Sequence, residues 1–304
     1  MNNIINYYYK INVLDVYFLG DKYYFNYRDN NYFLVPFNRD INDLKGILII
    51  CDELKRRNIL TNEIIINIFN KYFIPINNKY YVLVKENTNI YNLTLNDILY
   101  IQNNTINISN NFNLYRTNSI KLWEDKIDYY EDKIKEIQNK YRYVDMTFDY
   151  FIGLAENAVI YLINNKVEVN NTVLSHRRIN IVNGSFDYYN PVNYIIDNRT
   201  RDFAEYIKQL FFSEKLDFEI VINFLNYMNF SKDEYVLLMG RLLFPTYYFD
   251  LLDRIIDNNE KDIILKNVYE KIDEYILFLK QLFNYILYNR RINIQFIPWI
   301  IKKI

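Results

Sequence analysis

Ser175-His176-Arg177-Arg178-Ile179-Asn180 is the stretch that decides the fold, and it contains the only histidine of the 304-residue chain. The next informative stretch, Ile195–Lys208, reads Ile-Ile-Asp-Asn-Arg-Thr-Arg-Asp-Phe-Ala-Glu-Tyr-Ile-Lys. Its first carboxylate, Asp197, follows an apolar pair that suits a buried strand, and its second, Asp202, precedes apolar residues at helical spacing. Together the two stretches predict a short β region whose polar loops lead into a helical domain.

The composition predicts a folded protein with a large core. Apolar residues make up 51% of the chain and aromatic residues 18%, well above the content of disordered chains. The net charge of −1 lacks the basic surplus of a nonspecific nucleic-acid binder, so no nucleic-acid partner is expected. The one cysteine, Cys51, excludes an internal disulfide and a cysteine-cluster zinc site, and its position at the end of the apolar run Gly46–Cys51 predicts a buried thiol.

Two features bear on the cellular location. Residues 1–10 lack the basic and apolar regions of a secretory signal peptide. The sequence also has no run of about eighteen uncharged apolar residues, which a membrane-spanning helix needs. We therefore expect a cytoplasmic protein without a membrane span.

Residues 1–88 are expected to form a small β-rich lobe. Gly20-Asp21 between two aromatic-rich stretches is a hairpin signal. Asp40–Arg57 carries its apolar residues on one helical face, and the polar segment Glu86–Asn92 is the expected hinge. The predicted strands are Tyr7–Leu19, Lys22–Tyr27, Tyr32–Phe37 and Lys79–Lys85.

Residues 89–304 are expected to form a mostly helical lobe. From Ile120 to Tyr141 apolar residues recur at alternating spacings of three and four. This stripe indicates a helix packed on its own domain or a coiled-coil partner surface, and its short length favours the first. The other helical segments expected are Asp149–Ile163 and a run that begins with Asp202–Phe212, and the tail Ile292–Ile304 is expected to dock through its apolar residues.

Several short motifs in a fixed order resemble those of one family. They are Leu122-Trp123-Glu124, Phe151–Ala158, Ser175–Arg178, Tyr189–Asp197 followed by Arg201–Ile207, Leu243–Tyr248 and Ile297–Ile300. With these motifs the chain resembles the spore-coat CotS/YutH branch of the aminoglycoside phosphotransferase superfamily, found in Gram-positive spore formers. The resemblance implies an α+β, bilobal, protein-kinase-like fold with a small β-rich N-lobe and a mostly helical C-lobe. It also implies a degenerate active site, protein partners of the spore-coat type, and a location in the mother cell or the coat.

The resemblance implies that the catalytic loop is altered. Active members carry a His-x-Asp motif, whose Asp accepts or orients the proton of the substrate hydroxyl. Here that position holds Arg178, and a guanidinium cannot act as a general base. We therefore expect a structural His176 and no catalytic residue in the motif His176-Arg177-Arg178.

The phosphate-binding parts of a kinase are also incomplete in this sequence. Only one of the five glycines, Gly20, lies in the predicted strand region, where a phosphate-gripping loop would need close backbone approach. The third predicted strand, Tyr32–Phe37, has no lysine. We expect Lys22, one strand earlier, to be a solvated charge and Glu53 on the following helix to be a surface residue.

Candidate metal and nucleotide ligands are few. Asn183 lies where the resemblance places a metal-binding Asn, but Asn183-Gly184 between two strand-like runs predicts a hairpin turn more strongly. Asp197 is a weak candidate for Mg²⁺ and nucleotide binding, because one carboxylate alone holds Mg²⁺ poorly. An ion pair of Asp197 with Arg199 or Arg201 is the alternative.

Two further polar residues are predicted to support the site structurally. Asp202 is expected to cap the helix that follows it, and Glu205, three residues later, would complete a capping box. The resemblance also allows Asp202 to pair with Arg177 or Arg178.

The function predicted first is that of a pseudokinase that works as a scaffold or assembly factor and needs no cofactor. The alternative is an active phosphotransferase that uses ATP and Mg²⁺ with Asp197 and either Asp187 or Asp202. A nucleotide-binding switch without turnover is a third possibility.

Overall fold

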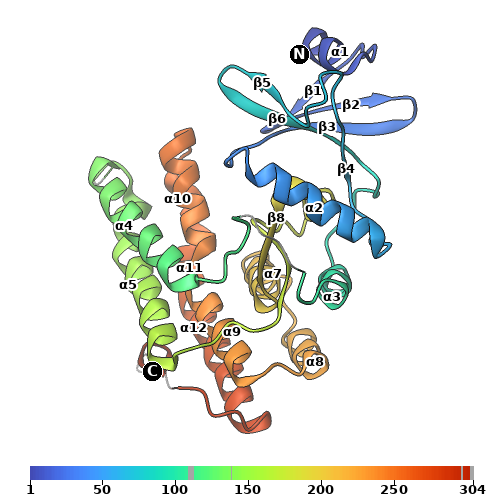
Figure 1. Cartoon of the computed structure of the whole chain (residues 1–304). Coiled ribbons are helices and arrows are strands. Elements are labelled where there is room, and N and C mark those ends of the chain that lie inside the picture. The colour runs from blue at the N-terminus through green and yellow to red at the C-terminus, as the bar shows by residue number, and fades with distance from the viewer. Residues whose placement is uncertain (109–112, 138, 296, 302–304) are drawn as a thin grey trace. The chain divides into compact units, whose positions relative to one another are not determined.

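The structure, a computed structural model, describes residues 1–108, 113–137, 139–295 and 297–301. The chain divides into two compact units. The first comprises residues 1–115 and 172–197, and the second comprises residues 116–171 and 198–304 (Figure 1). The boundary that the sequence predicts near residue 88 lies inside the first unit, because residues 172–197 pack with the segments on both sides of it.

The first unit is built on an antiparallel sheet. Its strands are β1 (Tyr17–Leu19), β2 (Lys22–Tyr27), β3 (Asn30–Pro36), β4 (Glu63–Ile64), β5 (Ile74–Ile76) and β6 (Lys79–Lys85). They pair in the order β1-β2-β3-β6-β4, with β5 on another part of β6. The predicted hairpin at Gly20-Asp21 is confirmed, since Leu19 pairs with Lys22 and Gly20 has a φ of +71°, which glycine adopts without steric cost.

The strand predicted over Tyr7–Leu19 is wrong except at its end: residues 7–9 belong to helix α1 (Asn2–Tyr9), residues 10–16 form no regular element, and only Tyr17–Leu19 is a strand. Ile4, Ile5, Tyr8 and Tyr9 pack on the sheet, and their spacing is that of one helical face. The aromatic run suggested β structure by composition, but the sheet offers these side chains a surface on which a helix buries more of them.

The central strands β3 and β6 are buried on both faces. Leu34 and Leu83 belong to the cluster under α1. The neighbouring Phe33 and Val84 are also buried, and they lie on the opposite face because successive side chains of a strand alternate. There Phe33 packs against Phe186, with ring centroids 4.0 Å apart. The second face of the sheet is therefore covered in part by residues from much later in the chain.

Helix α2 (Asp43–Arg56) confirms the helix predicted after the third strand, within slightly shorter bounds. Ile47 and Leu54 are buried on the predicted face. Cys51 is partly buried, and burial together with the charge of Asp52 raises the pKa of its thiol to about 12. The thiol therefore stays protonated at neutral pH, as an unreactive cysteine does.

The remaining elements of the first unit surround the histidine motif. Helix α3 (Leu95–Asn104) begins with a capping box formed by Thr94 and Asp97. Strands β7 (Thr172–His176) and β8 (Tyr194–Asn198) form a two-stranded sheet. The one-turn helix α6 (Ser185–Tyr188) and the 3-10 turn η1 (Pro191–Asn193) lie between them in sequence.

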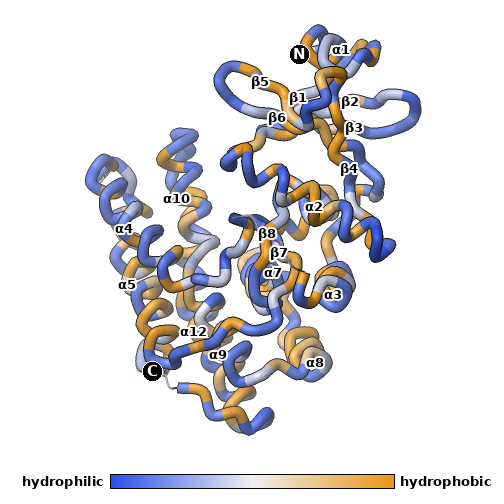
Figure 2. The backbone as a smooth tube through the Cα atoms, viewed as in Figure 1, coloured by the Kyte–Doolittle hydropathy of each residue, from blue (hydrophilic) through white to orange (hydrophobic). Residues whose placement is uncertain are grey.

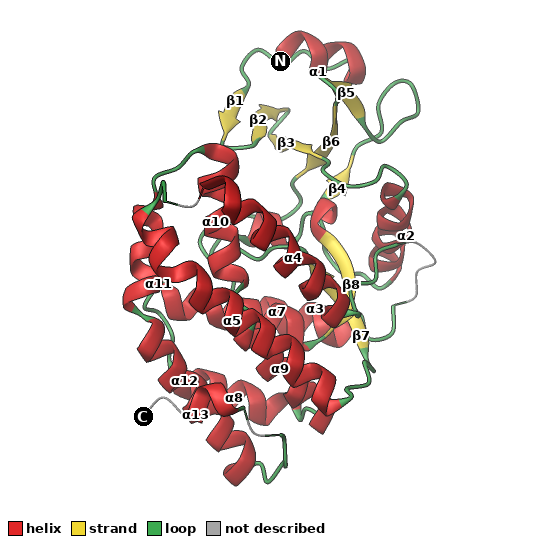
Figure 3. Ribbon diagram, turned by 90° about the vertical axis from the view of Figure 1, so that its left-hand side faces the viewer, coloured by secondary structure: helices red, strands yellow, loops and turns green. Residues whose placement is uncertain are grey.

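The second unit is helical (Figure 3). Its central helix is α9 (Lys232–Leu243), which is buried from Glu234 to Leu243 and packs on α5 (Arg142–Asn165) and α7 (Thr200–Phe212). Gly240 allows α5 to come close, because a Cβ there would lie 2.7 Å from Leu162. The other elements are α4 (Ser119–Ile137), α8 (Phe218–Met228), α10 (Thr246–Asn258), η2 (Asp262–Leu265), α11 (Lys266–Glu270), α12 (Ile272–Asn284), the π-helical η3 (Tyr285–Asn289) and α13 (Pro298–Ile301).

The apolar stripe that begins at Ile120 packs within its own unit, as the sequence favours. Trp123 of α4 stacks on Phe244 with centroids 4.4 Å apart, and Tyr130 stacks on Phe249 at 4.5 Å. The next helix, α5, begins earlier than the predicted Asp149, so the end of the stripe belongs to the turn between two helices.

Helix α5 is also the one helix, among the described residues, whose length and hydropathy would suit a membrane span. Of its most apolar window, 56% is buried, since α5 packs on α4 and α9; its apolar stretches are orange in Figure 2. The core helix of a globular unit meets the same criteria, and its burial favours that interpretation here.

The C-terminal tail docks as predicted. Ile294, Ile297 and Ile300 are buried, and α13 forms one short helix there. The last predicted residues of the tail, 302–304, lie outside the described residues.

Candidate functional site

Strand β7 brings His176 into the interior of the first unit. The imidazole is 1% exposed and stacks on Tyr188 with centroids 3.9 Å apart, while Tyr194 packs edge-on at 5.5 Å. The backbone N–H of Arg177 donates to the Asn193 carbonyl (2.9 Å), which ties the following loop to η1. His176 thus has the packed setting of a structural side chain, whereas the arginines after it are exposed.

The loop from Arg177 to Gly184 leads into helix α6 and not into a strand, so the hairpin predicted at Asn183-Gly184 is wrong. Asn183 does adopt a left-handed turn conformation, with a φ of 50°, and its backbone N–H donates to the Asn92 side chain (3.0 Å). A Cβ on Gly184 would lie 1.5 Å from the Asn180 carbonyl oxygen. The glycine is therefore required by a close approach of two backbone segments.

Lys22 is not the solvated charge that the sequence predicts. Its ammonium donates to the Asp187 carboxylate at 2.9 Å, and the two side chains are 20% and 32% exposed. The ammonium also lies 4.5 Å from the centroid of the Phe186 ring, and such a ring face attracts a cation. Asp187, predicted in a strand, belongs to α6, and the helix turns its carboxylate toward β2.

These side chains line a cavity of about 240 Å³ within the first unit. Its charged lining consists of Lys22, Arg177, Arg178, Asp21 and Asp187. Asparagine side chains add amide groups; they are Asn38, Asn180, Asn190 and Asn193. Charged and amide donors of this kind suit an anion such as a phosphate group, while one of the two carboxylates is already bound by a lysine.

Asp197, the predicted Mg²⁺ candidate, is fully buried in β8 and does not line this cavity. Arg199, one of its two predicted partners, forms an ion pair with Glu234. In the part of the chain that the structure describes, no group of three or more His, Cys, Asp or Glu side chains is arranged to hold a metal ion. A divalent ion at Asp197 would need its other oxygen ligands from a nucleotide or water.

Asp202 and Glu205 do not form the predicted capping box. Helix α7 begins two residues before Asp202, which therefore lies in the first turn. The Asn198 side chain accepts the hydrogen bond of the first helical N–H (3.0 Å). Glu205 accepts instead from Lys208 (2.8 Å) and Thr246 (2.7 Å). The spacing matched a capping box, but Lys208 of the same helix and Thr246 of α10 bind the Glu205 carboxylate instead.

Arg39 is a site residue that the sequence did not reveal. Its side chain, 3% exposed, pairs with Asp43 at 3.2 Å and donates to the Tyr194 carbonyl at 2.7 Å. It thereby joins the start of α2 to the start of β8. The one local signal was the four-residue spacing of Arg39 and Asp43, because the carbonyl partner lies 155 residues further on.

Solved structures identify the class of fold. Spectinomycin phosphotransferase APH(9)-Ia, in its AMP-bound complex, matches with a TM-score of 0.56 and 14% identity over 93% of each chain. An aminoglycoside phosphotransferase from Alicyclobacillus acidocaldarius matches with a TM-score of 0.57 and 11% identity, over 93% of this chain and 95% of its own. The predicted α+β, kinase-like fold of the aminoglycoside phosphotransferases is therefore confirmed.

The particular family follows from the sequence. The model of the family described as "Spore coat putative kinase YutH" matches residues 2–282, so the chain belongs to this family, as the motifs predict. The endospore coat-associated protein YutH of Bacillus subtilis (strain 168) is 26% identical over 147 residues. That match covers 43% of this chain and 41% of the relative, which is less than half the length of either.

Proposed function

We propose that this protein is a degenerate kinase-like protein, a pseudokinase, which acts as a scaffold or assembly factor of the spore-coat type and transfers no phosphate. One observation carries the proposal: Asp187, a carboxylate that shares the cavity with Arg178, is held by Lys22 at 2.9 Å. A carboxylate that an ammonium holds has to leave that contact before it can contact a substrate hydroxyl, so the pair keeps Asp187 from that position.

The position of Arg178 supports the same conclusion. By the family resemblance it stands where active kinases carry the Asp that orients the substrate hydroxyl. A guanidinium stays protonated and cannot accept that proton. The chain would therefore need another base, and the cavity offers Asp21 in the turn after β1 and the paired Asp187.

Nucleotide binding separates this proposal from its alternative. The cations and amides of the cavity fit phosphate oxygens, whereas Asp197, the candidate carboxylate for Mg²⁺, is fully buried and does not line it. Under the proposal the working protein needs no cofactor. Under the alternative it is an ATP-dependent phosphotransferase for a small molecule or a protein, in which Asp187 leaves Lys22 to act as the base.

The proposed partners are other proteins of the spore coat, and the proposed location is the cytoplasm of the mother cell or the coat itself. Membership of the family supports both, because the Bacillus subtilis relative is named as endospore coat-associated. A scaffold needs a stable fold and an accessible surface, and it does not need a base in the cavity.

The test is a titration of the purified protein with ATP, with and without Mg²⁺, followed by thermal unfolding and by ATP consumption. A ligand of the folded state raises the Tm by mass action. We expect no Mg²⁺-dependent shift up to millimolar ATP and no consumption above a blank without protein.

Two variants distinguish the other outcomes. Asp187→Asn removes the carboxylate that Lys22 holds, and Asp197→Asn removes the candidate metal ligand at nearly constant volume. A shift that Asp197→Asn abolishes, with ATP consumption that both variants lose, would establish the phosphotransferase. A shift without consumption would establish the nucleotide-binding switch.

A further inference from the structure

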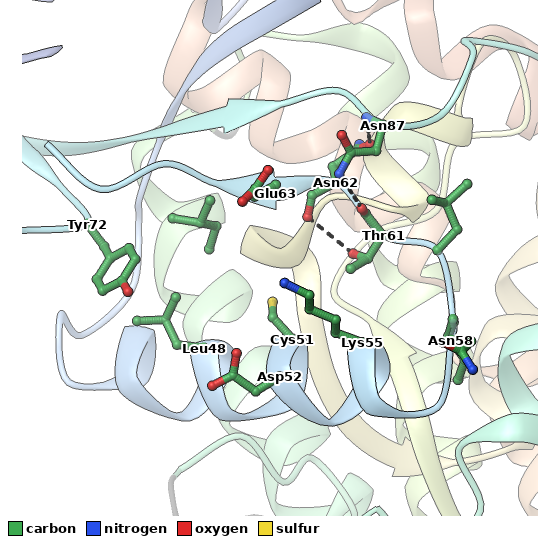
Figure 4. Close-up of a pocket in the computed structure, with 13 residues that line it drawn as sticks. Leu48, Cys51, Asp52, Lys55, Asn58, Thr61, Asn62, Glu63, Tyr72 and Asn87 are labelled. Atoms are coloured by element: carbon green, nitrogen blue, oxygen red, sulfur yellow. Dashed lines mark hydrogen bonds between the residues drawn. The ribbon is translucent and has the colours of Figure 1, made fainter. Parts of the chain in front are cut away.

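A second cavity in the first unit, which we call the α2–β4 pocket, lies apart from the one at Arg178. Its volume is about 510 Å³, within the range of roughly 300–1,000 Å³ that small-molecule sites occupy. One wall is α2, and the opposite wall is the segment Asn58–Ile64, which ends in β4 (Figure 4). The two cavities share no lining residue.

The interior of the α2–β4 pocket is partly apolar. Leu48 and Cys51 line it from α2, and Leu60 and Ile64 line it from the opposite wall. The Cys51 thiol is neutral at physiological pH, because burial and the charge of Asp52 raise its pKa to about 12. This part of the lining favours an apolar body of the ligand.

Three charged side chains complete the lining from opposite walls. Asp52 and Lys55 come from one face of α2, and Glu63 comes from β4. Figure 4 shows the Lys55 ammonium pointing into the space between α2 and β4, with the Glu63 carboxylate above it. None of the three makes an ion pair with another described residue, whereas Glu53 of the same helix pairs with Arg57 at 2.7 Å. The pocket thus holds charges of both signs that are left for a ligand.

One wall of the α2–β4 pocket is held in place by buried hydrogen bonds. The Asn62 side chain is fully buried, accepts from the Asn87 backbone N–H (3.0 Å) and donates to the Phe186 carbonyl (3.3 Å). Asn87 in turn donates to the Thr61 carbonyl (3.1 Å). A pocket whose wall is fixed in this way is preformed, so a ligand does not bear the cost of ordering it.

The pocket also offers backbone groups. β4 is the last strand of the sheet, and its partner on one side is β6, with Ile64 opposite Val84. Ile65 N–H donates to the Leu83 carbonyl (2.8 Å), and because backbone groups alternate along an antiparallel strand, those of Ile64 are directed away from β6. An edge strand of this kind can pair with a peptide backbone.

We propose that the α2–β4 pocket binds a short peptide with free termini, such as a dipeptide or tripeptide. The peptide carboxylate would contact Lys55, its ammonium group would contact Glu63 and Asp52, its apolar side chains would lie on Leu48 and Leu60, and its amide would face the edge of β4. The proposal concerns a ligand site that the kinase-like cavity does not use, so it stands independently of whether the protein transfers phosphate.

Ligands of a single charge fit less well. A phosphate-bearing ligand would meet two carboxylates around one lysine, and a polyamine would meet Lys55. Like charges in one pocket oppose binding, whereas a zwitterion pairs every charge in it. The charge pattern thus selects a ligand with both an ammonium and a carboxylate group.

The experiment is a titration of the full chain with leucyl-leucine by calorimetry, alongside its N-acetylated and C-amidated forms. We expect saturable binding of the free dipeptide and a loss of at least about tenfold on capping either end, since a charge-assisted hydrogen bond is lost. In Lys55→Gln, the C-amidated and the free dipeptide should bind with equal affinity. In Glu63→Gln, the difference in affinity between the N-acetylated and the free dipeptide should become smaller. Lys79→Gln, an exposed lysine outside the pocket, serves as the matched control and should keep both preferences.

Two results would overturn the proposal. One is the lack of saturable binding of leucyl-leucine by the unaltered protein at low millimolar concentration. The other is binding that Lys55→Gln and Glu63→Gln leave unchanged while their thermal unfolding matches the unaltered protein. ATP added to the same titration should not displace the dipeptide. This control distinguishes binding in the α2–β4 pocket from binding in the cavity at Arg178.

Discussion

Lys22 and Asp187 form a 2.9 Å ion pair across 165 residues of sequence. The pair joins β2 of the sheet to α6, directly after the loop that carries Arg178. Phe186 lies under the ammonium at 4.5 Å, so the pair is partly screened from water. The pair holds α6 against the sheet and keeps the Asp187 carboxylate in contact with Lys22.

Removing either partner of this ion pair should destabilise the protein moderately. We expect Lys22→Met and Asp187→Asn each to lower the free energy of unfolding by about 1–2 kcal/mol, because a partly exposed charge loses its partner. The double variant should lose less free energy of unfolding than the two single variants lose together. The difference, which is the coupling energy of the pair, should be about 0.5 kcal/mol or more. Urea unfolding measures all three. Lys121→Met, in the exposed pair with Asp125, is the control and should leave the urea midpoint unchanged. Zero coupling between Lys22 and Asp187 would contradict the argument.

Alanine at Gly184 should disrupt the loop more than alanine at Gly20. A Cβ at Gly184 would lie 1.5 Å from the Asn180 carbonyl oxygen, a backbone atom that no rotamer change can move. We therefore expect Gly184→Ala to lower stability by roughly 3 kcal/mol or more, as strained backbone does. A Cβ at Gly20 would contact no other atom, so Gly20→Ala is opposed only by the φ of +71° at this position. Alanine in this left-handed conformation costs about 1 kcal/mol. Equal thermal midpoints for the two variants would show that the loop relaxes around the new side chain.

The sequence predicted most of the sheet because turn residues mark its ends. Gly20-Asp21 identified the first hairpin, and Lys79–Lys85 was predicted with the bounds that β6 has. It failed at α1, where the run of aromatic residues suited either element and burial against the sheet decided for the helix. Local composition predicts the type of an element when turn residues mark its ends. Where they do not, tertiary packing decides between helix and strand.

The site was harder to predict than the fold, because its contacts are distant in sequence. Arg178 could be recognised from its motif, whereas Asp187, which pairs with Lys22, and the Tyr194 carbonyl, which accepts from Arg39, lie more than a hundred residues away from them. Gly184 gave a turn signal, yet it serves a close approach to Asn180. These contacts depend on tertiary packing, so the conformational preferences of single residues cannot predict them.

Loss of the buried ammonium of Lys208 should strongly destabilise the helical unit. Lys208 is 1% exposed and donates to Glu205 (2.8 Å), to Thr246 (2.6 Å) and to the Arg241 carbonyl (3.0 Å). Lys208→Met removes the ammonium that balances the Glu205 carboxylate, which then keeps only its bond from Thr246 among the contacts named here, and we expect a loss of about 3–5 kcal/mol. Adding Glu205→Gln should recover part of that loss, because it removes the unpaired charge. Lys133→Met, in an exposed pair with Glu136, should leave the thermal midpoint within about 1 °C.

Asp97 should make stability fall at acidic pH. Burial raises the pKa of Asp97, but hydrogen bonds from Thr94, Tyr91 and Tyr189 outweigh it and hold that pKa below its usual value. A lowered pKa in the folded state stabilises the protein above the unfolded value of about 3.9, and this contribution is lost as the pH falls through the folded value. Asp97→Asn should therefore lower the Tm at pH 7 by a few degrees, and the difference from the unaltered protein should shrink below about pH 4. A difference that stays constant from pH 7 to pH 3 would contradict this assignment.

Placing a carboxylate in the loop should not by itself create a phosphotransferase. In Arg178→Asp the motif regains its general base, yet β3 still has no lysine, and Lys22 is engaged by Asp187. Since phosphoryl transfer depends on positioning and charge stabilisation by several groups acting together, we expect ATP consumption to remain at the level of a blank. Arg178→Gln is the matched control, because it removes the same cation without adding a carboxylate. Consumption that appears in Arg178→Asp and disappears again with Asp197→Asn would mean that the base was the one missing part and that the remaining machinery is intact.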